Sequence, residues 1–145
     1  MTPLEKIQGL FDRSLDLKRQ VRDKHLGVLP VMADACARAV AQGGKILICG
    51  NGGSAGDAQH LAAELLVRLR PDINRGGIPA IPLALDSSSM TACANDYGFD
   101  LVFARMVEAL GHTGDVLLAL TTSGKSTNVL RALETAREMK IATLG

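Results

Sequence analysis

Two short loops in the sequence combine glycine with hydroxyl or amide side chains, a combination that suits the binding of an anion. The first is Gly50-Asn51-Gly52-Gly53-Ser54, and the second is Thr121-Thr122-Ser123-Gly124-Lys125-Ser126. Each follows an apolar run and precedes a segment with helical periodicity. Free backbone N–H groups, hydroxyls and the positive end of a helix together make a phosphate cradle. The loops are therefore the first candidates for a ligand site.

Both loops also fit weaker patterns for nucleotide binding. Gly50-x-Gly52-x-x-Ala55 fits a loose dinucleotide fingerprint, but the acidic residue expected about 20 positions later is absent there, and Asp86 comes too late. The segment from Ala119 to Ser126 fits a relaxed P-loop, which needs a magnesium-binding Asp on another strand. Plain N-capping by Ser126 is a further alternative, although capping requires only one hydroxyl. We favour a phosphate site.

His60 and Glu64 are the residues with the best acid-base and metal-binding chemistry. They stand four residues apart in a helical segment, so both project from one helix face, about one turn from the glycine loop. Leu61, Leu65 and Leu69 are expected to form the neighbouring apolar ridge, which leaves the other face free to line a ligand crevice. The alternative is an exposed pair that stabilises the helix by a few tenths of a kcal/mol.

Two further polar features are predicted from local spacing. Ser54 and Asp57 have the spacing of a capping box, which would open the helix that carries His60. Asn95-Asp96 stands between two helical segments, where a turn and a helix cap are the ordinary interpretation.

The elements that must position these residues follow from hydrophobic periodicity. Two amphipathic helices are predicted first, from about Leu4 to Val21 and from Leu29 to Ala41. Short apolar runs then alternate with helical segments, which is the rhythm of βαβ units. Strands are predicted at 45–49, 79–85, 116–120 and 141–144, and helices at 55–70, 89–94, 101–110 and 127–139.

The predicted fold class is α/β, a three-layer open parallel sheet with helices on both faces, flavodoxin-like, preceded by two N-terminal helices. Ligands of such sheets bind outside the carboxyl ends of the strands, where both loops fall. We expect a single domain over 1–145, with a helical element at 1–44 and a βαβ core at 45–145. The fourth strand ends with the sequence, so we expect the C-terminal part of the fold to be missing.

Composition argues against several classes of partner. Lys and Arg number 16 against 15 Asp and Glu, so the large basic field that nucleic acid or anionic lipid requires is not expected. The sequence shows no signal-peptide pattern and no apolar run long enough to span a bilayer, which favours the cytoplasm. Cys36, Cys49 and Cys93 lack metal-binding spacing and are predicted to be reduced, mostly buried thiols.

Taken in order, four motifs give a specific resemblance. They are the Asn51 to Ser54 loop, the Asp57, His60 and Glu64 helix, Asn95-Asp96-Tyr97-Gly98, and the Thr121 to Ser126 loop. Each motif alone is weak, but together they resemble the bacterial phosphoheptose isomerases of the sugar isomerase (SIS) fold. The resemblance covers essentially the whole chain. It departs only mildly at Thr121, where the family usually has Ser.

The resemblance implies a reaction and a binding site. It implies conversion of sedoheptulose 7-phosphate to D-glycero-D-manno-heptose 7-phosphate, a step toward the heptose of lipopolysaccharide core. The phosphate would then be held by Thr121, Thr122, Ser123 and Ser126. The sugar would be bound by Asn51, Gly52, Gly53, Ser54, Asn95 and Asp96.

The same resemblance implies catalytic and metal-binding roles for one helix. Glu64 would be the base of an enediol mechanism, with His60 beside it in the catalytic site. His60 and Glu64 would also be ligands of one zinc ion per site. Family members supply the remaining ligands, a Gln and a second His, from a later strand and helix. Two protein ligands alone bind zinc poorly.

Two other functions on the same fold stay open, and an assembly is implied. One is a non-catalytic relative that associates with the bacterial replication initiator, and the other is a regulatory sugar-phosphate sensor. Glu64 together with Asp96 favours the isomerase. Because relatives commonly place active sites between subunits, we expect a homo-oligomer, a tetramer, formed through the two N-terminal helices.

Overall fold

The computed structural model describes residues 1–145, and the chain divides into two compact units, Met1–Asp34 and Ala35–Gly145. Its elements in chain order are α1 (Pro3–Lys24), α2 (Val28–Ala41), β1 (Ile46–Gly50), α3 (Gly53–Leu66), β2 (Ala80–Pro82), α4 (Ser87–Tyr97), the short 3-10 helix η1 (Phe99–Leu101), α5 (Val102–Leu110), β3 (Val116–Leu120), α6 (Thr127–Glu138) and β4 (Ala142–Leu144). None of the helices combines the length and the apolar character needed to cross a bilayer.

The four strands form one parallel sheet in the order β2-β1-β3-β4. β1 is central and pairs along its whole length with β3, from Ile46 opposite Val116 to Gly50 opposite Leu120. All five residues of β1 are buried, as expected for a parallel strand covered on both faces. The predicted fold class, a parallel α/β sheet between helical layers, is confirmed.

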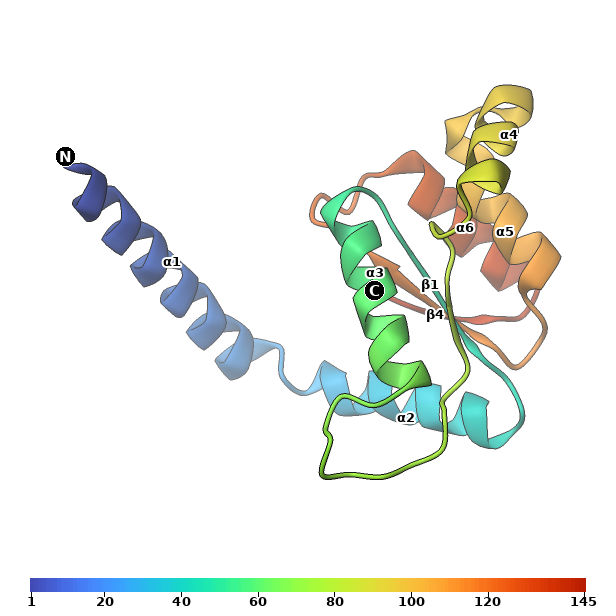
Figure 1. Cartoon of the computed structure of the whole chain (residues 1–145), viewed down its shortest axis with the longest axis horizontal. Coiled ribbons are helices and arrows are strands. Elements are labelled where there is room, and N and C mark those ends of the chain that lie inside the picture. The colour runs from blue at the N-terminus through green and yellow to red at the C-terminus, as the bar shows by residue number, and fades with distance from the viewer. The chain divides into compact units, whose positions relative to one another are not determined.

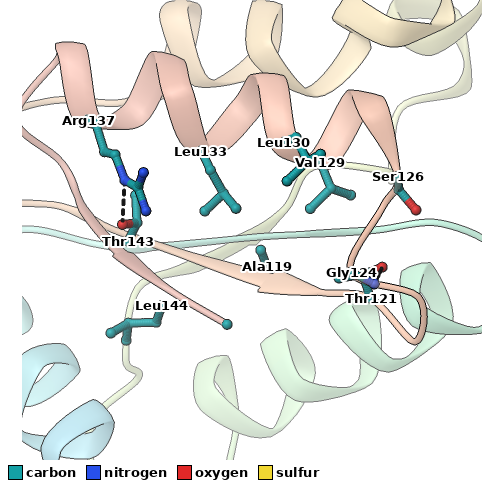
Figure 2. A pocket seen from close by; sticks show the side chains of 11 residues that line it. Ala119, Thr121, Gly124, Ser126, Val129, Leu130, Leu133, Arg137, Thr143 and Leu144 are labelled. Carbon is teal, nitrogen blue, oxygen red and sulfur yellow. Dashed lines mark hydrogen bonds between the residues drawn. The ribbon is translucent and has the colours of Figure 1, made fainter.

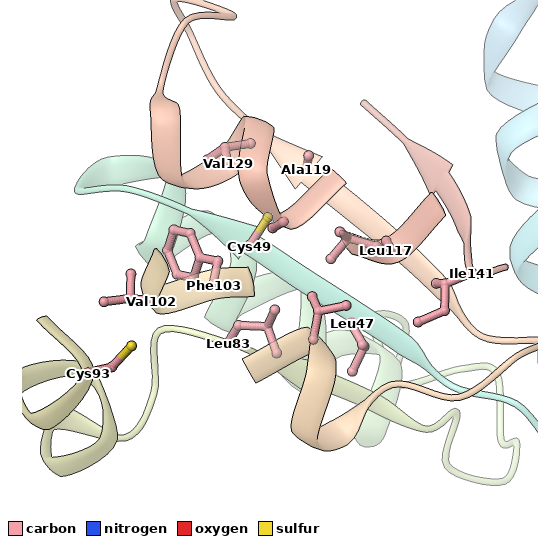
Figure 3. Close-up of a cluster of buried hydrophobic side chains, with 13 residues drawn as sticks. Leu47, Cys49, Leu83, Cys93, Val102, Phe103, Leu117, Ala119, Val129 and Ile141 are labelled. Carbon is pink, nitrogen blue, oxygen red and sulfur yellow. The ribbon is translucent and has the colours of Figure 1, made fainter. Parts of the chain in front are cut away.

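Two apolar clusters hold helices to the two faces of the sheet. On one face α5 and α6 pack against the strands through a cluster that includes Leu47, Phe103 and Leu117 (Figure 3). On the other face α3 packs through Ala58 and Ala62, together with Cys36 and Val40 of α2. Figure 1 shows α3 on the side of the sheet opposite α5 and α6. The small alanine side chains let α3 lie close to the strands.

The carboxyl end of β1 contains a cysteine in the first cluster. Cys49 is fully buried between β3 and the helices, and its burial raises the pKa of the thiol to about 12. Cys36 and Cys93 are also free thiols, partly buried and buried respectively. The prediction of mostly buried thiols is confirmed.

Several element boundaries differ from the sequence prediction. β2 ends at Pro82 and not at 85, although the N–H of Leu83 still donates to the carbonyl of Ile48 in β1 at 2.8 Å. α4 begins earlier because Asp86 caps it, accepting from the N–H groups of Ser88 and Ser89, and it continues to Gly98, whose φ is 90°. Asn95 and Asp96 therefore lie in the last turn of α4, and the prediction that they form a turn between helices is wrong.

α3 ends at Leu66, short of the predicted 70, because the following loop folds back onto it. Arg75 donates hydrogen bonds to the backbone carbonyls of Glu64 and Leu65, at 2.5 and 2.8 Å. The N–H of Ile78 also donates to the carbonyl of Leu65. A guanidinium on the last carbonyls complements the negative end of the helix. The chain between α3 and β2 is thus fixed to the helix end.

A buried ion pair closes the sheet at its amino end. Asp115 is 3% exposed, and its carboxylate accepts from Lys45 Nζ at 2.6 Å and from the backbone N–H groups of Lys45 and His112 at 2.9 and 2.8 Å. Burial by itself raises the pKa of Asp115, but the hydrogen bonds from Lys45 and His112 outweigh it, so the pKa is lowered overall. The charged carboxylate is therefore the stable form in the fold.

Asp115→Asn should lower the free energy of unfolding at neutral pH by about 2–3 kcal/mol, because the amide leaves Lys45 without its buried counter-ion. The lowered pKa means that the stabilisation by Asp115 is complete above its unfolded pKa and is lost as pH falls through the folded pKa. The difference in the free energy of unfolding between wild type and variant, measured with urea at neutral and at acidic pH, should therefore be smaller in acid. Asp72→Asn, which removes a carboxylate paired with exposed Arg70, should leave stability unchanged; equal losses in both variants would contradict the assignment.

Candidate functional site

Chain topology places the two glycine- and hydroxyl-containing loops side by side. From β1 the chain crosses through α3 on one face to β2, whereas from β3 it crosses through α6 on the other face to β4. The loops after β1 and β3 leave neighbouring strands in opposite directions at their carboxyl ends. This is a topological switch point, where ligands of open parallel sheets bind.

The loop after β1 depends on glycine for its shape. A Cβ on Gly50 would lie 2.8 Å from Ser54 Cβ and 2.9 Å from the carbonyl oxygen of Leu120, so only glycine fits between the start of α3 and the end of β3. Gly52 has a φ of 56°, which glycine adopts without strain. The backbone N–H groups of Gly52 and Gly53 make no hydrogen bond within the chain and remain available to a ligand.

The predicted capping box at Ser54 and Asp57 is wrong. α3 begins at Gly53 after the N-cap Gly52, and no side chain caps it. Ser54 lies inside the first turn, and its N–H donates to the carbonyl of Asn51 at 3.0 Å. The positive φ of Gly52 starts the helix earlier than the capping pattern indicated.

The loop after β3 is shaped by two of its hydroxyls and leaves two uncommitted. Thr121 Oγ1 accepts from the N–H of Gly124 at 3.2 Å, and Ser123 Oγ accepts from the N–H of Lys125 at 3.1 Å. Ser126 is the N-cap of α6, but its side chain makes no capping hydrogen bond. The hydroxyls of Thr122 and Ser126 and the N–H groups of Thr127 and Asn128, the first two of α6, therefore have no partner within the chain.

A pair of amide side chains joins the two loops. Asn51 Nδ2 donates to Asn128 Oδ1, and Asn128 Nδ2 donates to Asn51 Oδ1, both at 2.9 Å. Asn128 lies in the first turn of α6 and is buried. The sequence reasoning missed it, although one pattern pointed to it: Asn128 continues the buried face of Ala132 and Ala136 at helical spacing. An amide on a buried helix face requires a polar partner.

His60 and Glu64 are brought together but lie apart from the loop after β3. His60 Nε2 is 3.0 Å from Glu64 Oε1, and the pair lines a shallow depression of about 220 Å³ on α3 together with Asp57, Leu61 and Leu69. The His60 side chain is 76% exposed and that of Glu64 is 27% exposed. Within this chain the pair faces solvent and shares no cavity with the loop after β3.

The predicted apolar ridge on this helix is wrong. Leu61 is exposed, and Leu69 lies beyond the end of α3 and is 71% exposed. The face that packs on the sheet consists of Ala58 and Ala62, with Leu65 beside them. Small residues carry the packing here, which a pattern based on leucine spacing does not detect.

Asn95 and Asp96 are hydrogen-bonded to each other and to neither loop. Asn95 Nδ2 donates to Asp96 Oδ1 at 2.8 Å, and both residues are exposed. At the opposite end of α4, Asp86 accepts from the hydroxyl of Ser89 and the N–H of Ser88, which lower the pKa of its carboxyl. A fixed negative charge thus occupies the N-terminus of α4.

A pocket begins at the loop after β3. It measures about 300 Å³ and runs beneath α6 from Thr121, Gly124 and Ser126 toward Arg137, as Figure 2 shows. Leu130 and Leu133 of α6 and Leu144 of β4 form its apolar walls. At the far end Arg137 Nε donates to Thr143 Oγ1 at 3.5 Å. The hydroxyl loop thus borders an open pocket on this side and the amide pair on the other.

The donor set fits a zinc ion only in part. An imidazole and a carboxylate 3.0 Å apart are suitable ligands. The chain offers no group of three His, Cys, Asp or Glu side chains that could hold a metal. His60 and Glu64 alone leave a zinc site incomplete, so no catalytic step is derived through a metal.

Comparison with known proteins matches this fold and site to one class. Residues 10–145 match the family model described as SIS domain. The chain belongs to the SIS domain family, and within it to the phosphoheptose isomerases. It is 54% identical over 131 residues to the phosphoheptose isomerase of Chlorobaculum parvum, covering 90% of this chain and 63% of that protein. The Roseiflexus sp. (strain RS-1) phosphoheptose isomerase is 46% identical over 135 residues, 93% of this chain and 68% of that protein.

A solved structure supports the same conclusion. A phosphoheptose isomerase from Francisella tularensis superimposes with a TM-score of 0.93 at 38% identity, covering 99% of this chain and 74% of that chain. The resemblance predicted from the four motifs is confirmed. The chain spans about three-fifths of the length of the Chlorobaculum relatives that it matches.

Gly50→Ala should lower the free energy of unfolding by about 2–3 kcal/mol, because the added methyl group meets the backbone of Ser54 in α3 and of Leu120 at the end of β3. Gly56→Ala is the matched control, since a Cβ there meets open space within α3. It should raise stability by about 0.5–1 kcal/mol. Denaturant unfolding of the two variants measures both effects, and a neutral Gly50→Ala would contradict the close packing of the strand ends.

Proposed function

We propose that the chain is the sugar-phosphate-binding core of an isomerase that converts sedoheptulose 7-phosphate to D-glycero-D-manno-heptose 7-phosphate. One observation carries the proposal: a helix N-terminus with uncommitted hydroxyls opens at the switch point of the sheet. The identity to phosphoheptose isomerases along nearly the whole chain supports the substrate.

The phosphate is assigned to the loop after β3 by comparing the three helix N-termini at the carboxyl ends of the strands. Asp86 already supplies an anion to α4. Neither α3 nor α6 has an acidic residue in its first turn, but only α6 is preceded by a lysine, Lys125. A dianionic phosphate is favoured where positive charge, free N–H groups and hydroxyls coincide. Thr121 and Ser123 shape this loop, and Thr122 and Ser126 donate to the phosphate.

Ser126→Ala should weaken phosphate binding about tenfold, because a hydrogen bond to a charged group is lost. It should leave thermal stability unchanged, since the Ser126 side chain caps nothing in the free chain. Isothermal titration with inorganic phosphate and a melting curve test both parts.

Ser88→Ala is the control, at the N-terminus of α4 that Asp86 occupies, and should leave phosphate affinity unchanged. Equal affinity of wild type and Ser126→Ala would overturn the assignment of the phosphate.

The sugar is assigned to the loop after β1 and to the end of α4, with Asn51, Gly52, Gly53, Ser54, Asn95 and Asp96 as its contacts. The free N–H groups of Gly52 and Gly53 suit the carbonyl and hydroxyl oxygens of an open-chain sugar. Glu64 is the base that removes a proton from C1 of the ketose and returns it to C2. The hydroxyl proton of O1 is lost and O2 is protonated, which leaves the aldose. His60 orients Glu64 through their hydrogen bond.

Zinc is proposed as the cofactor, one ion per site, with His60 and Glu64 as two of its ligands. Imidazole and carboxylate chemistry supports this, and a zinc ion would polarise the sugar carbonyl. The remaining ligands are proposed to come from the additional length of the relatives, since this chain supplies no third one.

Glu64→Gln should reduce kcat by about 100-fold or more, because the amide cannot accept the proton. The assay follows isomerisation of sedoheptulose 7-phosphate, with zinc and with chelator, by this chain and by a version extended to the length of the relatives.

Glu108→Gln, which removes an exposed carboxylate paired with Arg105, should keep full activity. Phosphate binding without isomerisation in either wild-type form would favour a non-catalytic SIS protein over the enzyme.

A homo-oligomer, proposed to be a tetramer, is supported by two features. The phosphate loop and the His60/Glu64 pair lie in different cavities of one chain, so a complete site gains from a second subunit. α1 has no buried residue and exposes Leu4, Ile7 and Phe11 at helical spacing. Cytoplasmic location is proposed because three free thiols suit a reducing compartment.

Phe11→Lys should shift the sedimentation coefficient toward smaller species, because a charge on the apolar stripe opposes helix packing. Asp12→Lys, at the neighbouring exposed position, is the control and should keep the assembly. Analytical ultracentrifugation at micromolar concentration measures the sedimentation coefficient of both variants. A wild-type chain that sediments only as a monomer would contradict the proposal.

A further inference from the structure

The amide pair between Asn51 and Asn128 is the only side-chain hydrogen bonding between the loop after β1 and the start of α6. The two residues are 77 positions apart in sequence, and their hydrogen bonds form a closed ring. A reciprocal amide ring fixes both the distance and the orientation of its partners, unlike a single hydrogen bond. The two halves of the switch-point crevice are therefore held in one geometry.

The two amides differ in how much of their hydrogen-bonding capacity is used. Asn128 is 3% exposed, and its Oδ1 accepts from both Asn51 Nδ2 and the N–H of Val129, so both lone pairs are occupied. Asn51 is only half-buried and uses one N–H and one lone pair in the ring. One donor and one acceptor of Asn51 remain free. Asn128 thus holds Asn51 in place, and Asn51 is the residue of the pair that can form a hydrogen bond with a ligand.

We infer that Asn128 is a positioning residue, which holds Asn51 and the loop after β1 in register with the phosphate loop so that one rigid crevice binds both ends of a sugar phosphate. This inference rests on the proposed function. Rigid placement matters because the two ends of the ligand are covalently joined. If the loop after β1 is displaced, it loses its contacts with the sugar, whereas the contacts with the phosphate are unaffected. Loss of Asn128 should therefore weaken recognition of the sugar more than that of phosphate.

The test compares two ligands on the full chain, inorganic phosphate and sedoheptulose 7-phosphate, by isothermal titration. The dissociation constant for phosphate divided by that for sedoheptulose 7-phosphate measures what the sugar adds to binding. Asn128→Ala should reduce this ratio about tenfold, to the value found for Asn51→Ala. The double variant should show no further loss, because Asn128 acts through Asn51.

Two further variants separate positioning from stability. Asn128→Leu keeps the shape of the buried side chain without its polar atoms and should reduce the ratio as Asn128→Ala does. Asp115→Asn destabilises the opposite end of the sheet and should keep the ratio of wild type. If the Asn128 variants keep the wild-type ratio, or if the double variant loses more than Asn51→Ala does, the positioning role is overturned while the proposed function stands. A wild-type chain that binds the sugar phosphate no better than phosphate overturns the proposed function.

Discussion

The pairing of β1 with β3 is the constraint on which the rest of the structure depends. It runs the full length of both strands and brings their carboxyl ends so close that Gly50 has no room for a side chain. Because the crossovers from these strands go to opposite faces, the same pairing creates the crevice between their loops. The buried core on both faces and the candidate site are thus consequences of one strand contact. A shift in the register of β1 against β3 would separate the core from the candidate site.

The two ends of the sheet differ in how far their polar groups are hydrogen-bonded within the chain. At the amino end, Asp115 accepts three hydrogen bonds and Lys45 neutralises it, so no charge is left for a ligand. At the carboxyl end, the Ser126 hydroxyl and the N–H groups of Thr127 and Asn128 have no partner within the chain. Unsatisfied groups are tolerated there because they face solvent or a ligand. Polar groups are thus paired within the fold at the amino end and left uncommitted at the carboxyl end.

The fold and the position of the two glycine-containing loops at the strand ends could be predicted from the sequence, because apolar runs and glycine loops are local patterns. What could not be predicted depended on contacts between distant segments. The start of α3 is set by the φ of Gly52, its end by Arg75 from the following loop, and the orientation of Asn51 by Asn128. The face of α3 that packs on the sheet consists of Ala58 and Ala62, and leucine spacing indicated a different face. Periodicity located the elements, and only tertiary contacts placed their side chains.

Cys49 is a chemically inert part of the core next to the loop after β1. It immediately precedes Gly50, and with a thiol pKa of about 12 it holds almost no thiolate at neutral pH. Thiolate is the form that oxidants and electrophiles attack, so the strand beneath the loops resists peroxide and alkylating metabolites that would modify an accessible cysteine. The protein thereby keeps a sulfur atom beside its binding loops without the oxidative liability that such a position would ordinarily carry.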